Sequence, residues 1–150
     1  MHVAAAVLCD FAEVREGLLM LLGGGITRLW RQELPAPMGV ALALVVEIAP
    51  TERAVPHEIT FAVRDPASTE VGKGGAGLQL GPEAVFDADE RAVIPLVVPL
   101  PFQIQRYGWH SLHILFDSEE ERVIRFRVGQ HPQPMGGVPI PGSRSRHRPN

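Results

Sequence analysis

The stretch Glu58-Ile59-Thr60-Phe61-Ala62-Val63-Arg64 places a large apolar side chain at every second residue. Successive side chains of an extended strand point to opposite faces, so this period of two predicts a strand with one buried face. The same alternation recurs in residues 111–116 and 124–128. The mostly acidic residues 117–120 between these two stretches are expected to connect them as a hairpin.

Other apolar segments indicate where further strands lie. Residues 40–48 are apolar at both their odd-numbered and their even-numbered positions, which predicts a central strand covered on both faces. Three prolines interrupt the run 93–102, and proline cannot donate a ladder hydrogen bond, so an edge strand or a bulged strand is expected there. Three glycines at 23–25 are expected to form a hairpin turn between strands at 18–22 and 26–30.

Residues 11–22 admit two interpretations. Asp10-Phe11-Ala12-Glu13 has the form of a helix cap, and the apolar residues at 14, 18, 21 and 22 would share one helical face. Gly17 in the middle of such a helix would cost about 1 kcal/mol relative to alanine. We therefore favour a turn through residues 15–17 followed by a strand.

These segments add up to seven to nine short strands with few helical candidates. This pattern predicts an all-β fold, an antiparallel β-sandwich of the immunoglobulin-like or C2-like kind. We assign residues 1–128 to the sandwich domain and residues 129–150 to a basic C-terminal tail rich in proline and glycine. A chain of 150 residues can bury a core of its own without disulfides. The single cysteine, Cys9, lies among apolar residues and is expected to be a buried, inert thiol in a reducing compartment.

The first third of the chain resembles a family of small uncharacterised bacterial proteins, mainly actinobacterial, classed as a domain of unknown function. The residues that carry the resemblance are Leu8-Cys9-Asp10, Glu16-Gly17-Leu18-Leu19, Gly23-Gly24-Gly25-Ile26-Thr27-Arg28, Trp30, Pro35, Pro37 and the apolar strand to Glu47. The resemblance extends to Val128 and leaves out the tail. It implies a compact all-β domain and a bacterial source, and it brings no catalytic or binding residues with it.

The apolar start of the chain, residues 1–9, is not expected to be an export signal. No Lys or Arg precedes the apolar residues, and Asp10 ends the run well short of the about 20 residues of a membrane span. We therefore expect a cytoplasmic protein that does not enter the membrane.

The histidines do not have the spacing of a metal site. His110 and His113 are three apart on a predicted strand, so they point to opposite faces and cannot share an ion unless the strand pairing is bulged. His57 is in phase with Ile59 and is expected to be a hydrogen-bonded structural residue at a strand end.

Two acidic loops support an alternative reading as a ligand- or calcium-binding sandwich. They are Asp87-Ala88-Asp89-Glu90 and Asp117 with Glu119, Glu120 and Glu121. Loops of a sandwich that gather at one end can hold calcium through oxygen ligands. Neither loop has the spacing of a helix–loop–helix calcium site, and we favour solvated turns.

No motif for catalysis or cofactor binding is found. The glycine-rich residues 72–77 run into Leu78-Gln79-Leu80 and a Gly-Pro turn rather than into a helix, so we expect a flexible loop and not a phosphate site. A Gly-x-Ser-x-Gly element is absent, and the aromatic cluster at 107–110 is expected to pack in the core or to plug a loop rather than to stack on a ligand. We predict a protein that is not an enzyme and has no cofactor, catalytic residues or metal.

The tail is the predicted contact element. A Pro/Gly segment with so few large apolar groups cannot fold alone, so we expect it to lie extended against a neighbouring surface. The net charge of the chain is −3, and because the tail adds three arginines and no acid, the remainder carries −6. This acidic body disfavours nucleic acid and matches the basic tail. The expected function is a non-enzymatic protein-interaction or assembly module, binding a protein partner or itself in a homo-oligomer. The predicted contact residues of the tail are Met135, Val138, Ile140, Arg144, Arg146 and Arg148.

Overall fold

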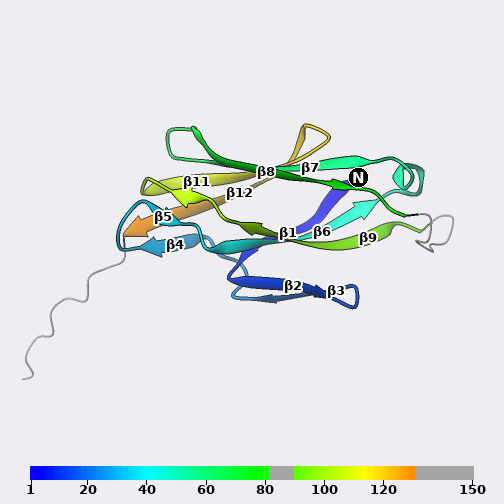
Figure 1. Cartoon of the computed structure of the whole chain (residues 1–150), viewed down its shortest axis with the longest axis horizontal. Coiled ribbons are helices and arrows are strands. Elements are labelled where there is room, and N and C mark those ends of the chain that lie inside the picture. The colour runs from blue at the N-terminus through cyan, green and yellow to red at the C-terminus, as the bar shows by residue number, and fades with distance from the viewer. Residues whose placement is uncertain (82–89, 131–150) are drawn as a thin grey trace, which may run out of the picture.

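The computed structural model describes residues 1–81 and 90–130, which are almost entirely extended (Figure 1). Within these ranges there is no α-helix, and only the 3-10 turn η1 (Pro50–Glu52) interrupts the strands. No helix in the described ranges is long and apolar enough to cross a membrane. The twelve strands are β1 (His2–Cys9), β2 (Phe11–Arg15), β3 (Leu18–Leu22), β4 (Arg28–Arg31), β5 (Ala36–Pro37), β6 (Val40–Ile48), β7 (His57–Arg64), β8 (Glu70–Leu78), β9 (Ala92–Leu100), β10 (Gln103–Ile104), β11 (Gly108–Phe116) and β12 (Glu119–Gln130).

The predicted all-β class is confirmed, but the predicted number of strands is too low. The described part of the chain has twelve strands where seven to nine were expected. Two of them, β5 and β10, are only two residues long. A two-residue strand shows no period of two, so sequence patterning cannot detect it.

Most of the strands belong to two larger sheets. One has the order β1-β6-β9, and the other has the order β4-β12-β11-β7-β8. All neighbours are antiparallel except β4 and β12, which run parallel. As predicted, β6 is central, and β9, which contains Pro95 and Pro99, is an edge strand. The pairs β2–β3 and β5–β10 form two small separate sheets.

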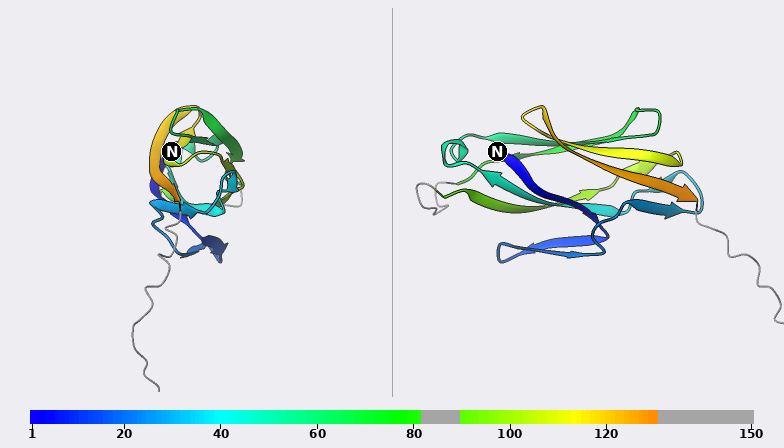
Figure 2. Two further views of the ribbon diagram at one scale, coloured as in Figure 1. Left: turned by 90° about the vertical axis from the view of Figure 1, so that its left-hand side faces the viewer. Right: turned by 180° about the vertical axis from the view of Figure 1, so that it is seen from behind.

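One apolar core lies between the two larger sheets. Leu42, Leu44 and Val46 of β6 belong to the same buried cluster as side chains of β7 and β11. The end-on view in Figure 2 shows the strongly curved five-stranded sheet wrapped over this core. The alternation of residues 58–64 is therefore the inside–outside pattern of β7, whose Ile59, Phe61 and Val63 are all buried.

Two tight turns close hairpins where the sequence predicted connections. Asp117 and Ser118 have φ of 48° and 74°, and they join β11 to β12. Glu16 and Gly17 have φ of 52° and 76°, and they join β2 to β3. Positive φ at both central residues is the geometry that two-residue hairpins favour. The turn-and-strand interpretation of residues 11–22 is confirmed, and the helix is wrong.

The predicted hairpin through the three glycines is wrong. Strand β3 pairs with β2, whereas β4 pairs in parallel with the distant β12. The amides of Gly25 and Ile26 both donate to the carbonyl of Leu8, at 3.0 and 3.1 Å, and this guides the chain from one sheet to the other. The positive φ expected of glycine is found at Gly23 and Gly25.

The predicted flexible loop at residues 72–77 is also wrong, because these residues lie within strand β8. They pair with β7 along the edge of the five-stranded sheet. A Cβ on Gly72 would lie 2.3 Å from a ring carbon of Phe102, so the ring packs directly on the strand backbone. Glycine in a strand often marks such a close approach.

Candidate functional site

The β2–β3 hairpin exposes more large apolar side chains than any other element in the described ranges. Six of its side chains are between 44% and 70% exposed. Groups of exposed large apolar side chains mark interaction surfaces, whereas single exposed apolar residues need no explanation. We call these six residues the hairpin surface; they are Phe11, Val14, Leu18, Met20, Leu21 and Leu22.

Small residues attach the hairpin to the rest of the fold. Ala12 is buried against Cys9 and Ala43, and Leu19 and Val97 pack around them in a cluster separate from the main core. The hairpin therefore lies on the side of the β1-β6-β9 sheet that faces away from the core, as Figure 1 shows. Such a thin contact fixes the hairpin in place and leaves its other side uncovered.

Strand β3 has an open edge. Among the described strands it pairs only with β2. Its sequence, Leu-Leu-Met-Leu-Leu, contains no charge and no proline. Edge strands are normally protected from association by lysines, prolines or bulges. The unprotected edge of β3 is therefore suited to pairing with another strand.

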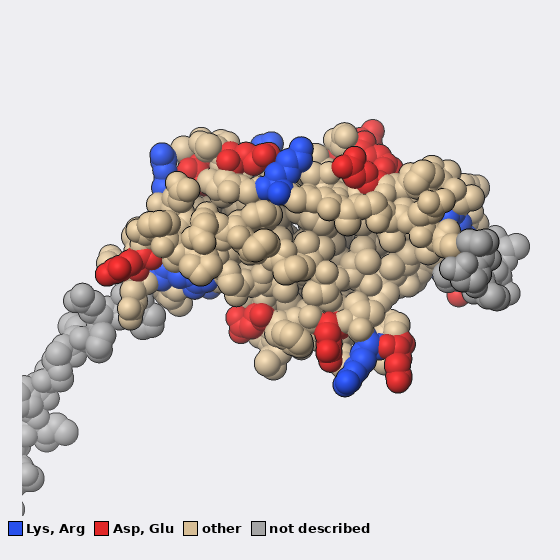
Figure 3. All heavy atoms as spheres, in the orientation of Figure 1, with Lys and Arg blue, Asp and Glu red and all other residues tan. Residues whose placement is uncertain are grey.

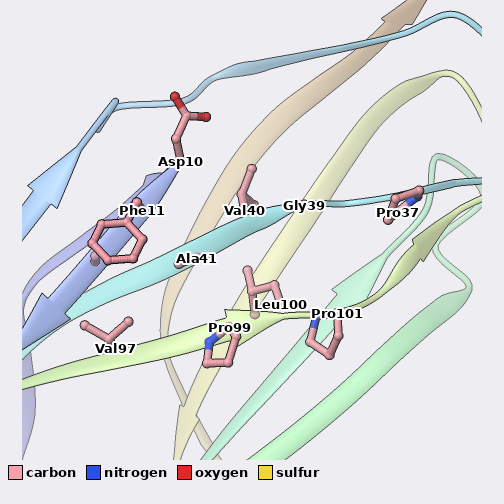
Figure 4. Close-up of a pocket in the computed structure, with 11 residues that line it drawn as sticks. Asp10, Phe11, Pro37, Gly39, Val40, Ala41, Val97, Pro99, Leu100 and Pro101 are labelled. Atoms are coloured by element: carbon pink, nitrogen blue, oxygen red, sulfur yellow. The ribbon is translucent and has the colours of Figure 1, made fainter.

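A shallow apolar groove of about 470 Å³ runs along the base of the hairpin (Figure 4). Phe11 and Val97 line it from β2 and β9, and Pro99 and Pro101 continue the same wall. Asp10 is the one charged residue in its lining. The groove extends the hairpin surface and offers no set of polar groups that could carry out a reaction.

A second surface, which is basic, lies on the outer face of the five-stranded sheet. Arg28 of β4 is directly opposite Arg127 of β12, and Arg127 is opposite Trp109 of β11. In the next row, Arg125 is opposite Ser111, which is opposite Arg64 of β7. We call this surface the arginine face; its members are Arg28, Arg64, Arg125, Arg127, Trp30 and Trp109, all of them exposed.

Trp30 is held at the edge of the arginine face by its neighbours. The Arg28 guanidinium carbon lies 5.3 Å from the centroid of the Trp30 ring. A Cβ on Gly129 would lie 2.7 Å from that ring, so the indole packs closely on the backbone of β12. Together with Arg127 and Gln130, these residues line a depression of about 250 Å³.

The predicted core packing of the aromatic cluster at 107–110 is wrong for Tyr107 and Trp109. They are 40% and 58% exposed, whereas His110 is buried. His110 occupies the inward phase of β11 with Leu112, so Trp109 has to face outward. The alternation in the sequence already contained this signal.

The histidines lie as the strand argument predicted. His110 faces inward and stacks on Phe126 with ring centroids 5.4 Å apart, whereas His113 bonds to Ser111 and Glu120 near the surface. Burial lowers the pKa of His110. His57 is a hydrogen-bonded structural residue, as expected, because its Nδ1 donates to Asp117 and its Nε2 lies 3.3 Å from the carbonyl of Glu52. Cys9 is buried, and burial raises the pKa of its thiol.

Three acidic side chains near the β11–β12 turn, Asp117, Glu119 and Glu121, line one depression of about 290 Å³ together with Glu52. Asp117 binds His57 and the amide of Glu58, Glu120 binds His113, and Glu121 accepts from the amide of Val3. In the described ranges, no three His, Cys, Asp or Glu side chains are placed to hold a metal ion. Asp87 and Asp89 of the other acidic loop lie outside the described residues. The same is true of the predicted tail contacts Met135, Val138, Ile140, Arg144, Arg146 and Arg148.

The fold and these two surfaces define an all-β domain with exposed apolar and basic faces. Residues 4–129 match the model of a family of unknown function (DUF6941). The chain therefore belongs to this family, and the resemblance to a domain of unknown function is confirmed. No curated protein matches the chain.

Proposed function

We propose that the chain is a non-enzymatic β-sandwich module of the cytoplasm that acts by protein contact and associates with a second copy of itself through the hairpin surface. The observation that carries the proposal is the unprotected edge of β3 beside six exposed apolar side chains. By the register of β2 and β3, four of the six (Phe11, Leu18, Met20 and Leu22) lie on one face of the hairpin, and Val14 and Leu21 lie on the other. The groove at the hairpin base continues the first face at Phe11.

A second copy is the partner that the geometry of the hairpin fits best. Antiparallel pairing of two β3 edges would join two hairpins into one four-stranded sheet, with a two-fold axis between the strands. A two-stranded sheet alone is marginally stable, and the added strands would complete it. The same residues would then serve both copies, as an isologous interface requires.

Burial of part of the exposed apolar area would contribute to this association. Full burial of one large apolar side chain contributes about 1.5–3 kcal/mol. Complete burial of the six side chains on both copies, each about half exposed, would contribute on the order of 10 kcal/mol. Association costs roughly 4–15 kcal/mol in lost motion, and edge pairing covers only part of this surface, so we expect a weak dimer that is reversible with concentration.

The tail is the second contact element in this proposal. Val138 and Ile140 would serve as apolar anchors with Met135, and Arg144, Arg146 and Arg148 would face acidic groups of the neighbouring copy. The charge of −6 on the remainder of the chain supports this arrangement. Replacing Val138 and Ile140 with serine is expected to weaken association without changing the thermal unfolding of the domain.

Sedimentation velocity over a range of concentrations tests the proposal. The wild-type chain is expected to shift from monomer to dimer as its concentration rises to about 100 µM, the weak end of specific association. The double variant Leu18→Lys and Leu22→Lys is expected to remain a monomer, because each lysine would carry a charge into the interface. Val55→Lys, at a residue that is 48% exposed outside the hairpin, is the matched control. A wild-type chain that stays monomeric throughout would contradict self-association.

A further inference from the structure

We propose that the arginine face is a binding platform for single-stranded nucleic acid. This inference concerns a different face from the hairpin surface, and it does not depend on self-association. It rests on three observations: the register that gathers arginines on one face, the lack of ion pairs for three of them within the described ranges, and the tryptophans that lie among them.

The register of the sheet places like charges side by side. Arg28 and Arg127 are direct partners in adjacent strands, and Arg125 lies two residues before Arg127 on the same face. Like charges opposite one another destabilise a sheet. No residue in the described ranges forms an ion pair with Arg64, Arg125 or Arg127. Glu70, opposite Arg64 on β8, is the one acidic residue that the register places beside them. A bound polyanion would relieve this repulsion.

The tryptophans favour nucleic acid over an acidic polypeptide. Trp109 is 58% exposed and lies in the same row as Arg127 and Arg28. Neighbouring strands are about 4.8 Å apart, so this row spans about 10 Å across the outer face of the sheet. Bases of a single strand stack on exposed aromatic rings while arginines contact its phosphates. An acidic peptide would use the arginines but would leave the indole unused, and the stacked bases of a duplex cannot reach it.

The acidic balance of the whole chain does not oppose binding at this face. The acidic turn that begins at Asp117 is eight residues along β11 from Trp109, about 27 Å away at the rise of a strand. The Debye length is about 8 Å at physiological salt, so those charges are screened there. Figure 3 shows that, on the side in view, acidic and basic side chains are scattered and do not form one continuous acidic surface. The net charge of the chain is acidic and disfavours nucleic acid, but the local charge of the arginine face has the opposite sign.

Fluorescence anisotropy with a fluorescein-labelled thymidine 20-mer and the full-length chain tests the proposal. We expect saturable binding at 50 mM salt, with log Kobs falling against log salt by about 0.7 per phosphate contact. Tryptophan emission should be quenched on binding. A duplex of the same length and poly-glutamate should compete at least tenfold less well than unlabelled single strand. Equal competition by poly-glutamate would show an acidic-protein surface instead, and equal competition by duplex would show charge attraction without stacking. Either result would overturn the proposal, as would the absence of binding.

Four single variants locate the binding to this face. Arg127→Gln should weaken binding about threefold or more and reduce the salt slope by about 0.7. Trp109→Ala should weaken binding roughly five- to a hundredfold, and Trp109→Phe should restore most of it because a ring remains for stacking. Arg15→Gln, an exposed arginine on the hairpin, removes the same charge elsewhere and should change binding by less than about twofold. An Arg15→Gln effect as large as that of Arg127→Gln would contradict a defined platform.

Discussion

The imidazole of His57 and the carboxylate of Asp117 are joined by a hydrogen bond of 2.8 Å between Nδ1 and Oδ2. The second carboxylate oxygen of Asp117 accepts from the amide of Glu58, also at 2.8 Å. One side chain in the β11–β12 turn thus holds the first two residues of β7. The contact spans 60 residues of sequence and fixes the hairpin end against its neighbouring strand.

Replacing Asp117 with Asn should destabilise the fold in a pH-dependent way. The hydrogen bond from the Glu58 amide, followed by that from His57, lowers the pKa of Asp117 below its ordinary 3.8. The stability from the ionised carboxylate is therefore fully present above about pH 3.8 and is lost as the pH falls through the folded-state pKa. Asparagine tolerates the positive φ of this position, so the change in stability reports mainly the loss of the carboxylate charge. Urea unfolding should show a larger wild-type advantage at pH 7 than at pH 3; an equal advantage at both would contradict this reading.

Replacing His110 with Phe should make the fold less sensitive to mild acid. His110 is 2% exposed, and its Nε2 has no hydrogen-bond partner among the described residues. Burial lowers its pKa from 6.5, so the unfolded chain takes up a proton at a pH where the folded chain does not. The free energy of unfolding must then fall as the pH drops below about 6.5. Phenylalanine would keep the stacking on Phe126 without a titrating group. Thermal unfolding at pH 7.5 and 5.5 should show a smaller drop for this variant than for the wild type or for His2→Gln.

Replacing Gly72 with Ala should test the packing of Phe102 on strand β8. The added methyl would overlap the ring, since its nearest ring carbon would be only 2.3 Å away. Overpacking of this kind typically costs about 1–3 kcal/mol. Gly77, on the same strand, has no atom within 4 Å of an added Cβ, so Gly77→Ala is the matched control. It should change the free energy of unfolding by less than about 0.5 kcal/mol. Equal effects in urea titrations would show that strand propensity, and not the ring, requires glycine at 72.

The strands with alternating sequences were predictable because successive side chains point alternately into the core and out to solvent. This is why the sequence identified β7, β11 and β12, the central β6 and the proline-bearing edge β9. The turn at Glu16 and Gly17 was also predictable, because positive φ has a local chemical signature. Pairing between distant strands has no such signature. The parallel contact of β4 with β12 joins residues about a hundred positions apart. Because β4 pairs there, the three glycines connect two different sheets instead of forming the expected hairpin.

The two candidate surfaces were missed for different reasons. The sequence of Leu18–Leu22 is as apolar as that of a core strand. Whether such a strand is buried depends on whether other elements of the fold are left to pack on it. The arginines of β12 alternate visibly in the sequence, but Arg28 and Arg64 reach the same face only through the order of the sheet. Net charge concealed this face because it averages over the whole chain. The alternation of buried and exposed residues along β11 would by itself have placed Trp109 on the outer face of the sheet.

Amide exchange along β3 tests self-association most directly. Arg15 and Leu18 flank the two-residue turn as a pair, so by the alternation of antiparallel ladders the Leu18 and Met20 amides face β2, and those of Leu19 and Leu21 face the open edge. We predict that NMR at about 10 and 500 µM, either side of the expected dissociation range, shows slow exchange for Leu19 and Leu21 only at the higher concentration. The Leu18 and Met20 amides should be protected at both. Rapid exchange of Leu19 and Leu21 at both concentrations would contradict the account.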